Sequence, residues 1–362
     1  MEKLLYVSDV SLPNKSAYAV HVMKMCEAFS EQKEVDLVVN HNSEKWKVLK
    51  RNYNLKNNIN IISLNNFKVG NFFFRIINAY KTLKLIKKNN YKIIISRNII
   101  TSTILAFYGL KNILEIHTEL TGLTKKIFFL FLKKNKKNLK FIFIHRNLNS
   151  FFKLKKNFII LDDAINLKDF NNIKNKTIKN KFVYTGSLIK GKGIELILEL
   201  AAHFRNYKFF LYGNLDTFPK SLNPKRKMIK NLIVNDFIEY SKIPSVLKSA
   251  EFLLMPYPKK AGVLMRGIDV QDYISPLKMF EYLAAKKIIF ASHNEAYKHI
   301  LINNFNSLII EPENKTKWIN KINYVLNNKK KFNKLKKNSF KTVKKYTWEK
   351  RSEKILNFAL KK

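Results

Sequence analysis

The chain has 362 residues, which is long enough for two domains, and 46% of them are hydrophobic. Its single cysteine, Cys26, excludes an internal disulfide and favours a reducing compartment. We find neither a secretory signal nor an apolar stretch of membrane-spanning length, and we therefore expect a cytoplasmic protein. The net charge of +43, from 69 Lys and Arg against 26 Asp and Glu, attracts polyanions such as nucleic acid or an anionic membrane surface.

The first half of the chain alternates short apolar runs with helical stretches. Residues 3–9 predict a buried strand, 19–32 an amphipathic helix and 35–39 a second strand. A helix at 75–89 and strands at 58–64, 92–96, 113–117, 141–145 and 158–161 are also expected. This alternation is typical of a parallel sheet with helices on both faces.

A polar segment separates this half from a second half with the same pattern. Residues 168–181 have no apolar period and resemble a linker, and a new strand begins at 182–186. The rest predicts a helix at 194–204, strands at 208–213, 232–234, 252–257, 288–292 and 307–312, and an amphipathic terminal helix. We therefore expect the α/β class, with two doubly wound domains over 1–170 and 182–344 and a linker over 171–181. Ligands of such sheets bind beyond the carboxyl ends of the strands, here in a cleft between the domains.

The stretch DYISPLKMFEYLAA, residues 272–285, places a carboxylate on an apolar stripe. Glu281 lies one helical turn from Leu277 on one side and from Ala284 on the other. A buried carboxylate is unfavourable unless a partner satisfies it, which indicates a ligand at this position. The alternative is that Glu281 turns to solvent or pairs with a nearby lysine.

The start of the same helix has the features of an anion site. Ser275 as the N-cap and Pro276 as the first helical residue predict a helix start. The N–H groups of Leu277 and Lys278 would then be free, and the helix dipole favours an anion beside them. A diphosphate bound there would place its ribose near Glu281, whose carboxylate can accept hydrogen bonds from both hydroxyls.

A second candidate phosphate site is the stretch YTGSLIKGKGIELI, residues 184–197. A strand runs into a loop with Gly186, Gly191 and Gly193, and then into a helix. Glycines allow the backbone to approach a phosphate closely, and Lys192 can reach it as a point charge. Neither the P-loop nor the GxGxxG spacing is present, so an ordinary strand–helix turn is the alternative.

Two further segments of the first half are candidates. The loop over 8–22 contains the run Ser16, Ala17 and Tyr18, which leads into a helix, although a plain surface loop explains it equally well. His117 ends the strand of LEIHTEL, a position from which a side chain enters the ligand site. A lone histidine is also found as a packed residue. The scattered histidines and the single cysteine have no zinc spacing, so we expect no metal.

The segment over 124–141, TKKIFFLFLKKNKKNLKF, is both basic and aromatic. It predicts an amphipathic helix with phenylalanines on one side and a cluster of four lysines at its end: Lys133, Lys134, Lys136 and Lys137. Such a helix can lie on an anionic membrane surface, where each basic residue contributes about 1 kcal/mol. A buried helix with a solvated lysine edge is the alternative.

Together these segments resemble the retaining, family-4-type glycosyltransferases (glycosyl transferases group 1). The donor domain of that family is similar to YTGSLIKGKGIELILELA, IPSVLKSAEFLLMPY, SPLKMFEYLAAKKIIFAS and YTWEKRSEKIL. The acceptor domain is similar to SAYAVHVMKMCEAF, LEIH and DDAINLKDF. The segments occur in the family's order and cover nearly the whole chain.

The resemblance implies a GT-B fold, with two Rossmann-like domains facing each other and a C-terminal helix, 345–362, that crosses back to the first. It implies transfer of a sugar from a UDP- or GDP-sugar to a glycan, without a metal and with retention of the anomeric configuration. Lys192 then matches the phosphate-binding lysine, Glu281 the ribose-binding glutamate and His117 the histidine near the reacting sugar. The residues expected to bind the donor are Ser16, Ala17, Tyr18, Gly186, Ser187, Lys192, Ser275, Pro276, Leu277, Lys278 and Glu281.

The chain departs from the family pattern at three positions. Tyr273 stands where the first motif glutamate is expected, with Asp272 one residue away. Ser187 replaces the arginine that many relatives place beside the phosphates, and Lys286 replaces a helix-ending glycine.

Three hypotheses follow for the function. The first is an enzyme that glycosylates a lipid-linked surface polysaccharide or lipopolysaccharide, peripheral on the inner face of the cytoplasmic membrane. The second is a catalytically inactive relative that acts as a scaffold, as the departures at Tyr273 and Ser187 allow. The third is a nucleic-acid-binding protein, which only the net charge favours, because no DNA- or RNA-binding pattern is present.

Overall fold

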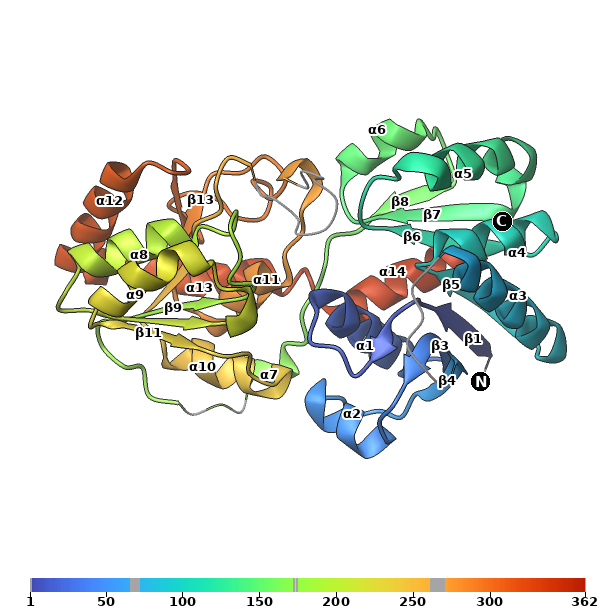
Figure 1. Ribbon diagram of the computed structural model, residues 1–362, viewed down its shortest axis with the longest axis horizontal. Coiled ribbons are helices and arrows are strands. Elements are labelled where there is room, and N and C mark those ends of the chain that lie inside the picture. The colour runs from blue at the N-terminus through green and yellow to red at the C-terminus, as the bar shows by residue number, and fades with distance from the viewer. Residues whose placement is uncertain (1, 66–71, 172, 174, 261–270, 362) are drawn as a thin grey trace. The chain divides into compact units, whose positions relative to one another are not determined.

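The computed structural model describes residues 2–65, 72–171, 173, 175–260 and 271–361. The chain divides into two compact units (Figure 1). The first comprises Met1–Asp162 and Trp348–Lys362, and the second comprises Asp163–Thr347. Both are α/β units built on parallel sheets, so the predicted fold class is confirmed. None of the helices in the described ranges combines the length and the apolar character that a membrane-crossing segment needs.

The sheet of the first unit has the order β2-β3-β1-β5-β6-β7-β8, with β4 paired to β3. Its strands are β1 (Lys3–Val7), β2 (Ser11–Leu12), β3 (Glu34–Asn42), β4 (Asn60–Asn65), β5 (Tyr91–Ser96), β6 (Asn112–Ile116), β7 (Leu139–Phe143) and β8 (Phe158–Ile160). Its helices are α1 (Ala17–Ser30), α2 (Trp46–Asn52), α3 (Phe72–Lys88), α4 (Ile99–Phe107), α5 (Gly122–Asn135), α6 (Asn149–Phe152) and α14 (Trp348–Leu360).

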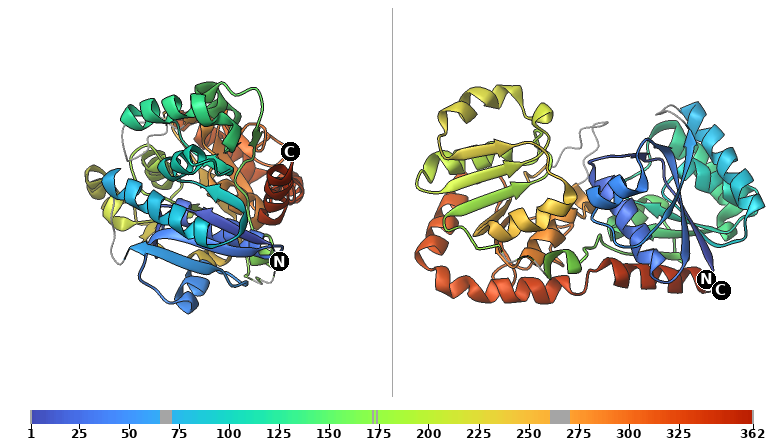
Figure 2. Two further views of the ribbon diagram at one scale, coloured as in Figure 1. Left: turned by 90° about the vertical axis from the view of Figure 1, so that its right-hand side faces the viewer. Right: turned by 90° about the horizontal axis from the view of Figure 1, so that it is seen from below.

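Alternation along the strands sends neighbouring side chains of this sheet to opposite faces. Leu5 and Val7 of β1 lie in an apolar core together with Leu83 of α3 and Leu105 of α4. Tyr6, between them in the strand, points to the opposite face and contacts the ring of Phe29 in α1. Helix α1 in turn packs against α14. The sheet therefore separates α3 and α4 on one face from α1 and α14 on the other (Figure 2).

The sheet of the second unit has the order β11-β10-β9-β12-β13-β14. Its strands are β9 (Lys181–Thr185), β10 (Lys208–Tyr212), β11 (Leu232–Asn235), β12 (Phe252–Met255), β13 (Ile288–Ser292) and β14 (Leu308–Ile310). Its helices are α7 (Lys168–Asn171), α8 (Ile194–His203), α9 (Asn223–Met228), α10 (Ile243–Ser249), α11 (Leu277–Ala285), α12 (Lys315–Asn327) and α13 (Asn333–Val343). Two apolar cores, one on each side of the strands, hold these elements together.

The segment that the sequence predicted as a polar linker is partly folded. Helix α7 begins at Lys168, and Phe170 lies in an apolar core of the second unit with only 2% of its surface exposed. Ile165, just before α7, forms a β-bridge with Thr347 and is almost fully buried. Residues 163–171 thus belong to the second unit, and the chain returns to the first at α14.

The predicted cap of α11 is wrong by one residue. Pro276 is the N-cap, with an extended ψ of 126°, and the helix begins at Leu277. The hydroxyl of Ser275 accepts a hydrogen bond from the N–H of Asp163 at 3.0 Å instead of capping the helix. Sequence spacing could not show this, because the partner is distant along the chain and reaches Ser275 only in the folded unit.

Gly193, at the start of α8, lies very close to the backbone of Pro256, the residue that follows β12. Its φ is +78°, and an added Cβ would lie 1.8 Å from the carbonyl oxygen of Pro256. We expect Gly193→Ala to lower the free energy of unfolding by more than about 2 kcal/mol, measured by urea denaturation. Gly109, with φ +80° and open space around it, is the control, and Gly109→Ala should cost only about 1 kcal/mol. Equal losses would contradict the close approach.

Candidate functional site

The candidate donor site lies where the strand order of the second unit reverses. Strand β9 has β10 on one side and β12 on the other, and the loops after β9 and β12 begin with Gly186 and Pro256. Such a reversal point is the usual ligand position in doubly wound sheets. Gly186 of the β9 loop, Gly193 at the N-cap of α8 and Lys278 at the start of α11 all belong to this region of the second unit.

Lys278 of α11 is the central charge of this site. Its Nζ lies 3.9 Å from the ring centre of Tyr184 and 5.4 Å from that of Tyr257. A Cβ added to Gly186 would lie 2.4 Å from the same Nζ, so only glycine leaves room for the lysine there. The Nζ is buried and makes no hydrogen bond within the described part of the chain. Burial, with Lys192 adding to the effect, holds the pKa of Lys278 well below its usual range.

Lys192 and Glu281 complete this group of charges. Lys192 Nζ lies 5.3 Å from the ring centre of Tyr257, so both lysines face the same aromatic side chain. Glu281, one turn after Lys278, is buried with 6% of its surface exposed. Burial raises the pKa of its carboxyl to about 7, and Asp169 adds to the shift while Lys278 opposes it. Lys192 therefore acts electrostatically on Lys278 at the start of α11, and Lys278 acts on the buried carboxyl group of Glu281.

This arrangement suits an anion followed by a hydroxyl-bearing group. The first N–H groups of a helix, here those of Leu277 and Lys278, lack partners within the helix and favour negative charge, as do the two ammonium groups. A buried ammonium without a hydrogen-bond partner is unfavourable, and a bound anion would restore its charged form. Among the residues predicted from sequence, Gly186, Lys192, Lys278 and Glu281 are brought together here, while Ser187 is exposed and offers its carbonyl to the hydroxyl of Tyr184.

Tyr273, at the position of the first motif glutamate, is buried at the end of a short helical turn, Gln271–Tyr273. Next to this turn lies a cavity of about 540 Å³. Its lining includes Gln271, Asp272, His293, Asn294, Glu295 and Glu311. Asp272, rather than Tyr273, is thus the residue of this pair that lines this cavity.

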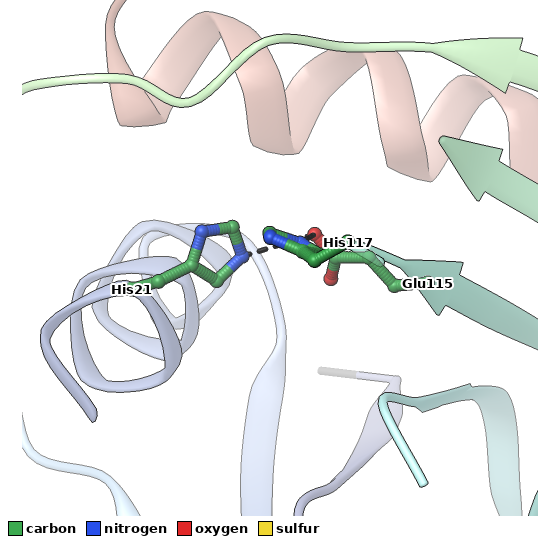
Figure 3. A group of neighbouring side chains, drawn as sticks. All are labelled: His21, Glu115 and His117. Carbon is green, nitrogen blue, oxygen red and sulfur yellow. Dashed lines mark hydrogen bonds and ion pairs between the residues drawn. The ribbon is translucent and has the colours of Figure 1, made fainter. Parts of the chain in front are cut away.

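In the first unit, the carboxylate of Glu115 is the centre of a buried hydrogen-bond cluster. Its Oε1 accepts from Arg351 Nη2 at 2.8 Å and from His117 Nε2 at 2.9 Å, and lies 3.0 Å from His21 Nε2. Its Oε2 accepts from the Tyr6 hydroxyl at 2.8 Å. Figure 3 shows His21 of α1 and His117, which follows β6, converging on this carboxylate. Although burial opposes ionisation, Arg351 and His21 hold the pKa of Glu115 well below its usual range.

This cluster orients His117. Burial, with Arg97 adding to the effect, lowers the pKa of His117 to about 3, so the ring is neutral near pH 7. A carboxylate only accepts hydrogen bonds, and His117 Nε2 must therefore carry the proton. The unprotonated Nδ1 is left as the acceptor of the ring, the form that a general base or a hydroxyl-binding group requires.

His21, Glu115 and His117 also form a set whose ligand atoms lie within 4.8 Å of one another, close enough to hold a metal ion. The guanidinium of Arg351 already supplies the positive charge at the shared oxygen. It would compete with a cation there, so the set is better described as an ion-pair cluster.

The predicted residues Ser16, Ala17 and Tyr18 begin α1. Ser16 caps the helix and accepts from the Ala19 N–H at 3.3 Å, and Ala17 is the first helical residue. The hydroxyl of Tyr18 donates to Asp9 at 2.6 Å, and the guanidinium of Arg97 lies 4.2 Å from the centre of its ring. Because Arg97 also acts on the pKa of His117, it links the start of α1 electrostatically to the cluster around Glu115.

A polar cavity of about 350 Å³ lies beside Tyr18, within the first unit. It is found where the strand order reverses at β1, between β3 and β5. Its polar lining includes Ser8, Asp9, Asn40, Arg75, Asn78 and Asn98. The amide of Asn78 donates to Asn40 Oδ1 at 3.1 Å, and that of Asn65 donates to the same oxygen at 2.8 Å. Hydrogen bonds therefore hold two of the lining side chains, Asn40 and Asn78, in place.

Glu115, His21 and Arg351 are site residues that the sequence analysis missed. Glu115 stands between Leu114 and Ile116 in a fully buried strand, which is the same signal that singled out Glu281. Arg351 lies on the buried stripe of the terminal helix, three residues after Trp348. A search for charges on apolar faces would have found both, although not their pairing.

Comparisons with solved structures place the fold among glycosyltransferases. A glycosyltransferase from Rickettsia africae ESF-5 matches with a TM-score of 0.77 and 14% identity, covering 99% of this chain and 97% of that one. Anabaena HepE in complex with UDP-glucose matches at 0.75 and 9%, covering 99% and 100%. WaaG, a glycosyltransferase involved in lipopolysaccharide biosynthesis, matches at 0.67 and 11%, covering 99% and 100%. A comparison with curated protein sequences gave no match.

The two parallel-sheet units and the terminal helix that returns to the first unit thus define the GT-B fold of glycosyltransferases. Residues 166–342, which include Lys192 and Glu281, match the model of the family described as glycosyl transferases group 1. The second unit is therefore similar to the group 1 glycosyltransferases.

The ion pair of Arg351 with Glu115 should be essential to the stability of the first unit. We expect Arg351→Met to lower the free energy of unfolding by about 3–5 kcal/mol, because it leaves a buried carboxylate without its cation. Denaturant unfolding measures this loss, with Lys354→Met on the exposed side of the same helix as control. Adding Glu115→Gln to Arg351→Met should recover part of the loss. If Arg351→Met were as stable as the control Lys354→Met, the ion pair of Arg351 with Glu115 would not stabilise the first unit.

Glu281 should make stability depend on pH. Its pKa is about 7 in the folded protein against an ordinary value of 4.5, so the folded state binds the proton more tightly. The stability that this proton contributes is present below pH 4.5 and is lost as the pH rises through 7. Glu281→Gln, which imitates the protonated form, should therefore gain on the order of 3 kcal/mol over the wild type above pH 7 and almost nothing at acid pH.

Urea unfolding at a series of pH values measures this difference. Glu353→Gln, at an exposed position, is the control and should follow the wild type throughout. Parallel curves for wild type and Glu281→Gln would show that the carboxyl is not buried in the way described.

Proposed function

We propose that this glycosyltransferase moves a sugar from a UDP- or GDP-sugar to a lipid-linked glycan, with retention of configuration and without a metal ion. The observation that carries the proposal is the buried Lys278 ammonium at the start of α11, beside Lys192 and one turn before Glu281. A nucleoside diphosphate has the matching groups, since its phosphates are anionic and its ribose bears two hydroxyls. Anabaena HepE, of the same fold, was solved with UDP-glucose.

The chemistry follows from the charges. An acceptor hydroxyl oxygen bonds to the anomeric carbon while the bond between that carbon and the diphosphate oxygen breaks. The diphosphate leaves with the bonding electrons, so negative charge grows on it, and it can take up the proton that the hydroxyl releases. Lys192, Lys278 and the N-terminus of α11, with the backbone from Ser275 and Pro276 to Leu277, would stabilise that charge in a site that is already arranged for it. These positive groups would supply the compensation that a metal ion provides in other transferases.

Lys278 also accounts for the missing arginine at Ser187. Its Nζ occupies the space next to Gly186, directly before Ser187 in the chain. We propose that this lysine, reaching the loop from α11, takes the place of the arginine that relatives carry in the loop itself. The departure at Ser187 then leaves the charge of the site intact.

The first unit would bind the acceptor. We propose that the polar cavity near Tyr18 takes the glycan, since its asparagines, Asp9 and Arg75 offer the donors and acceptors that sugar hydroxyls need. His117, with Nδ1 unprotonated, would lie near the reacting sugar and accept a hydrogen bond from a hydroxyl. The likeness to WaaG, described as involved in lipopolysaccharide biosynthesis, supports a lipid-linked surface glycan. Attack on the same face as the departing diphosphate accounts for retention, so no nucleophile of the protein is assigned.

The first experiment is a calorimetric titration with UDP, with GDP and with a short DNA duplex. We expect micromolar binding of one nucleotide. Glu281→Ala should weaken it about ten- to a hundredfold, because a charge-assisted hydrogen bond is worth about 1.5–3 kcal/mol. Asp216→Ala, at a surface position of the same unit, is the control. Nucleotide binding without sugar transfer would support the inactive scaffold, and binding of DNA alone would overturn the proposal.

Lys278→Met should change stability and nucleotide affinity in opposite directions. It replaces a buried, unpaired cation with an apolar side chain of similar length, so the variant should unfold at a higher temperature than the wild type. The same variant should lose about tenfold or more in nucleotide affinity. Differential scanning calorimetry and the titration above measure the two effects. A variant that keeps full affinity would show that the phosphates lie elsewhere.

A further inference from the structure

Three neighbouring helices of the first unit expose large apolar side chains. Helix α3 packs against α4, and α4 against α5 (Figures 1 and 2). Five residues define what we call the three-helix surface: Tyr80 of α3, Phe107 and Tyr108 at the end of α4, and Leu130 and Phe131 of α5. Their exposed fractions run from 37% for Phe131 to 66% for Leu130. Single exposed apolar residues are common, but a joined group indicates an interaction site.

The four rings of this surface form one continuous row. The ring centres of Tyr80 and Tyr108 are 6.3 Å apart, those of Phe107 and Tyr108 5.5 Å, and those of Phe107 and Phe131 5.7 Å. Each pair is T-shaped, with interplanar angles between 76° and 87°. On the other side of α5, Phe128 packs against Phe141 and Phe152, so the helix is anchored in the unit while its outer side is exposed.

The charge around this row has a single sign. The sequences of α3, α4 and α5 contain no Asp or Glu. Between Glu44 and Asp162 the chain has only two acidic residues, Glu115 and Glu119. The exposed lysines on and beside these helices include Lys84, Lys87, Lys88, Lys111, Lys133, Lys134, Lys136 and Lys137. Lys87 Nζ lies 5.7 Å from the ring centre of Tyr108, so the charges reach the aromatic row itself.

We infer that the three-helix surface docks on an anionic membrane, with Phe107, Leu130 and Phe131 entering the lipid interface and the lysines contacting phosphate headgroups. Aromatic rings and lysines are the side chains that favour the boundary between headgroups and acyl chains. A second copy of the chain would bring like charges together, which disfavours that partner. Nucleic acid would need ring faces for stacking, and these rings turn edges and faces toward one another. The inference rests on the proposed lipid-linked acceptor and names the surface that brings the enzyme to it.

Vesicle co-sedimentation of the full chain tests the inference. The probes are phosphatidylcholine vesicles with and without phosphatidylglycerol. Two variants remove the two halves of the surface: Phe107→Ser with Leu130→Ser and Phe131→Ser, and the change of Lys133, Lys134, Lys136 and Lys137 to Gln. Both should bind phosphatidylglycerol vesicles about tenfold more weakly than the wild type.

Matched controls come from the second unit. Met228→Ser with Phe305→Ser and Tyr324→Ser also removes three large apolar side chains that are exposed. Changing Lys330, Lys331, Lys334 and Lys337 to Gln removes the same number of exposed positive charges. Both controls should bind vesicles within about twofold of the wild type, because the inference is about position and not about total charge. All four variants should keep the nucleotide affinity of the wild type, which also shows that they are folded.

Three outcomes would overturn the inference. The wild type could fail to bind phosphatidylglycerol vesicles, the two lysine variants could lose binding equally, or the three-helix variants could lose binding to a DNA duplex or single-stranded RNA and not to vesicles. Failure of nucleotide binding by the wild type would overturn the proposed function and leave the vesicle result unaffected. Glu281→Ala, which should lose nucleotide and keep vesicle binding, separates the two.

Discussion

The buried carboxylate of Glu115 is the constraint on which the first unit depends. An ionised carboxylate in an apolar strand is tolerable only when its oxygens are satisfied, and here Tyr6, His21, His117 and Arg351 surround it. Arg351 comes from the last helix of the chain, so the end of the sequence is tied to a strand in the middle of the first unit. The same contact sets the proton on His117 and leaves its Nδ1 as an acceptor. The ion pair of Glu115 with Arg351 therefore stabilises the first unit, and the same carboxylate orients His117.

The second unit also buries charged groups, but without pairing them as the first unit does. Lys278 is a buried cation beside the rings of Tyr184 and Tyr257, and burial pushes it toward its neutral form. Glu281 is a buried carboxyl pushed toward its protonated form. In the first unit the charge is compensated within the protein, whereas the buried Nζ of Lys278 has no hydrogen-bond partner among the described residues. That contrast distinguishes a structural ion pair from a binding site, and it supports the proposed nucleotide site.

Much of the fold could be predicted from sequence because its signals are local. Strands such as Lys3–Val7 and Ile288–Ser292 are apolar runs of the expected length, and their alternation with helices predicts parallel sheets. The α7 segment could not be predicted, because Phe170 is a single apolar residue among polar ones and is ordered only by the core that it enters. The same holds for Ser275, whose hydroxyl bonds to a distant backbone group.

For the candidate site, the sequence by itself determined which residue types stand at helix starts, in loops and at strand ends: it indicated Lys192, Lys278 and Glu281 as candidates from helix and loop spacing, and His117 from its place at a strand end. The resemblance to group 1 glycosyltransferases could be drawn from short segments alone. Only the tertiary structure decided how these groups are charged and oriented. It placed Lys278 against Gly186, and Arg351 and His21 around Glu115. Periodicity assigns a residue to a face, whereas pKa values and hydrogen-bond partners depend on distances between elements that lie far apart in the chain.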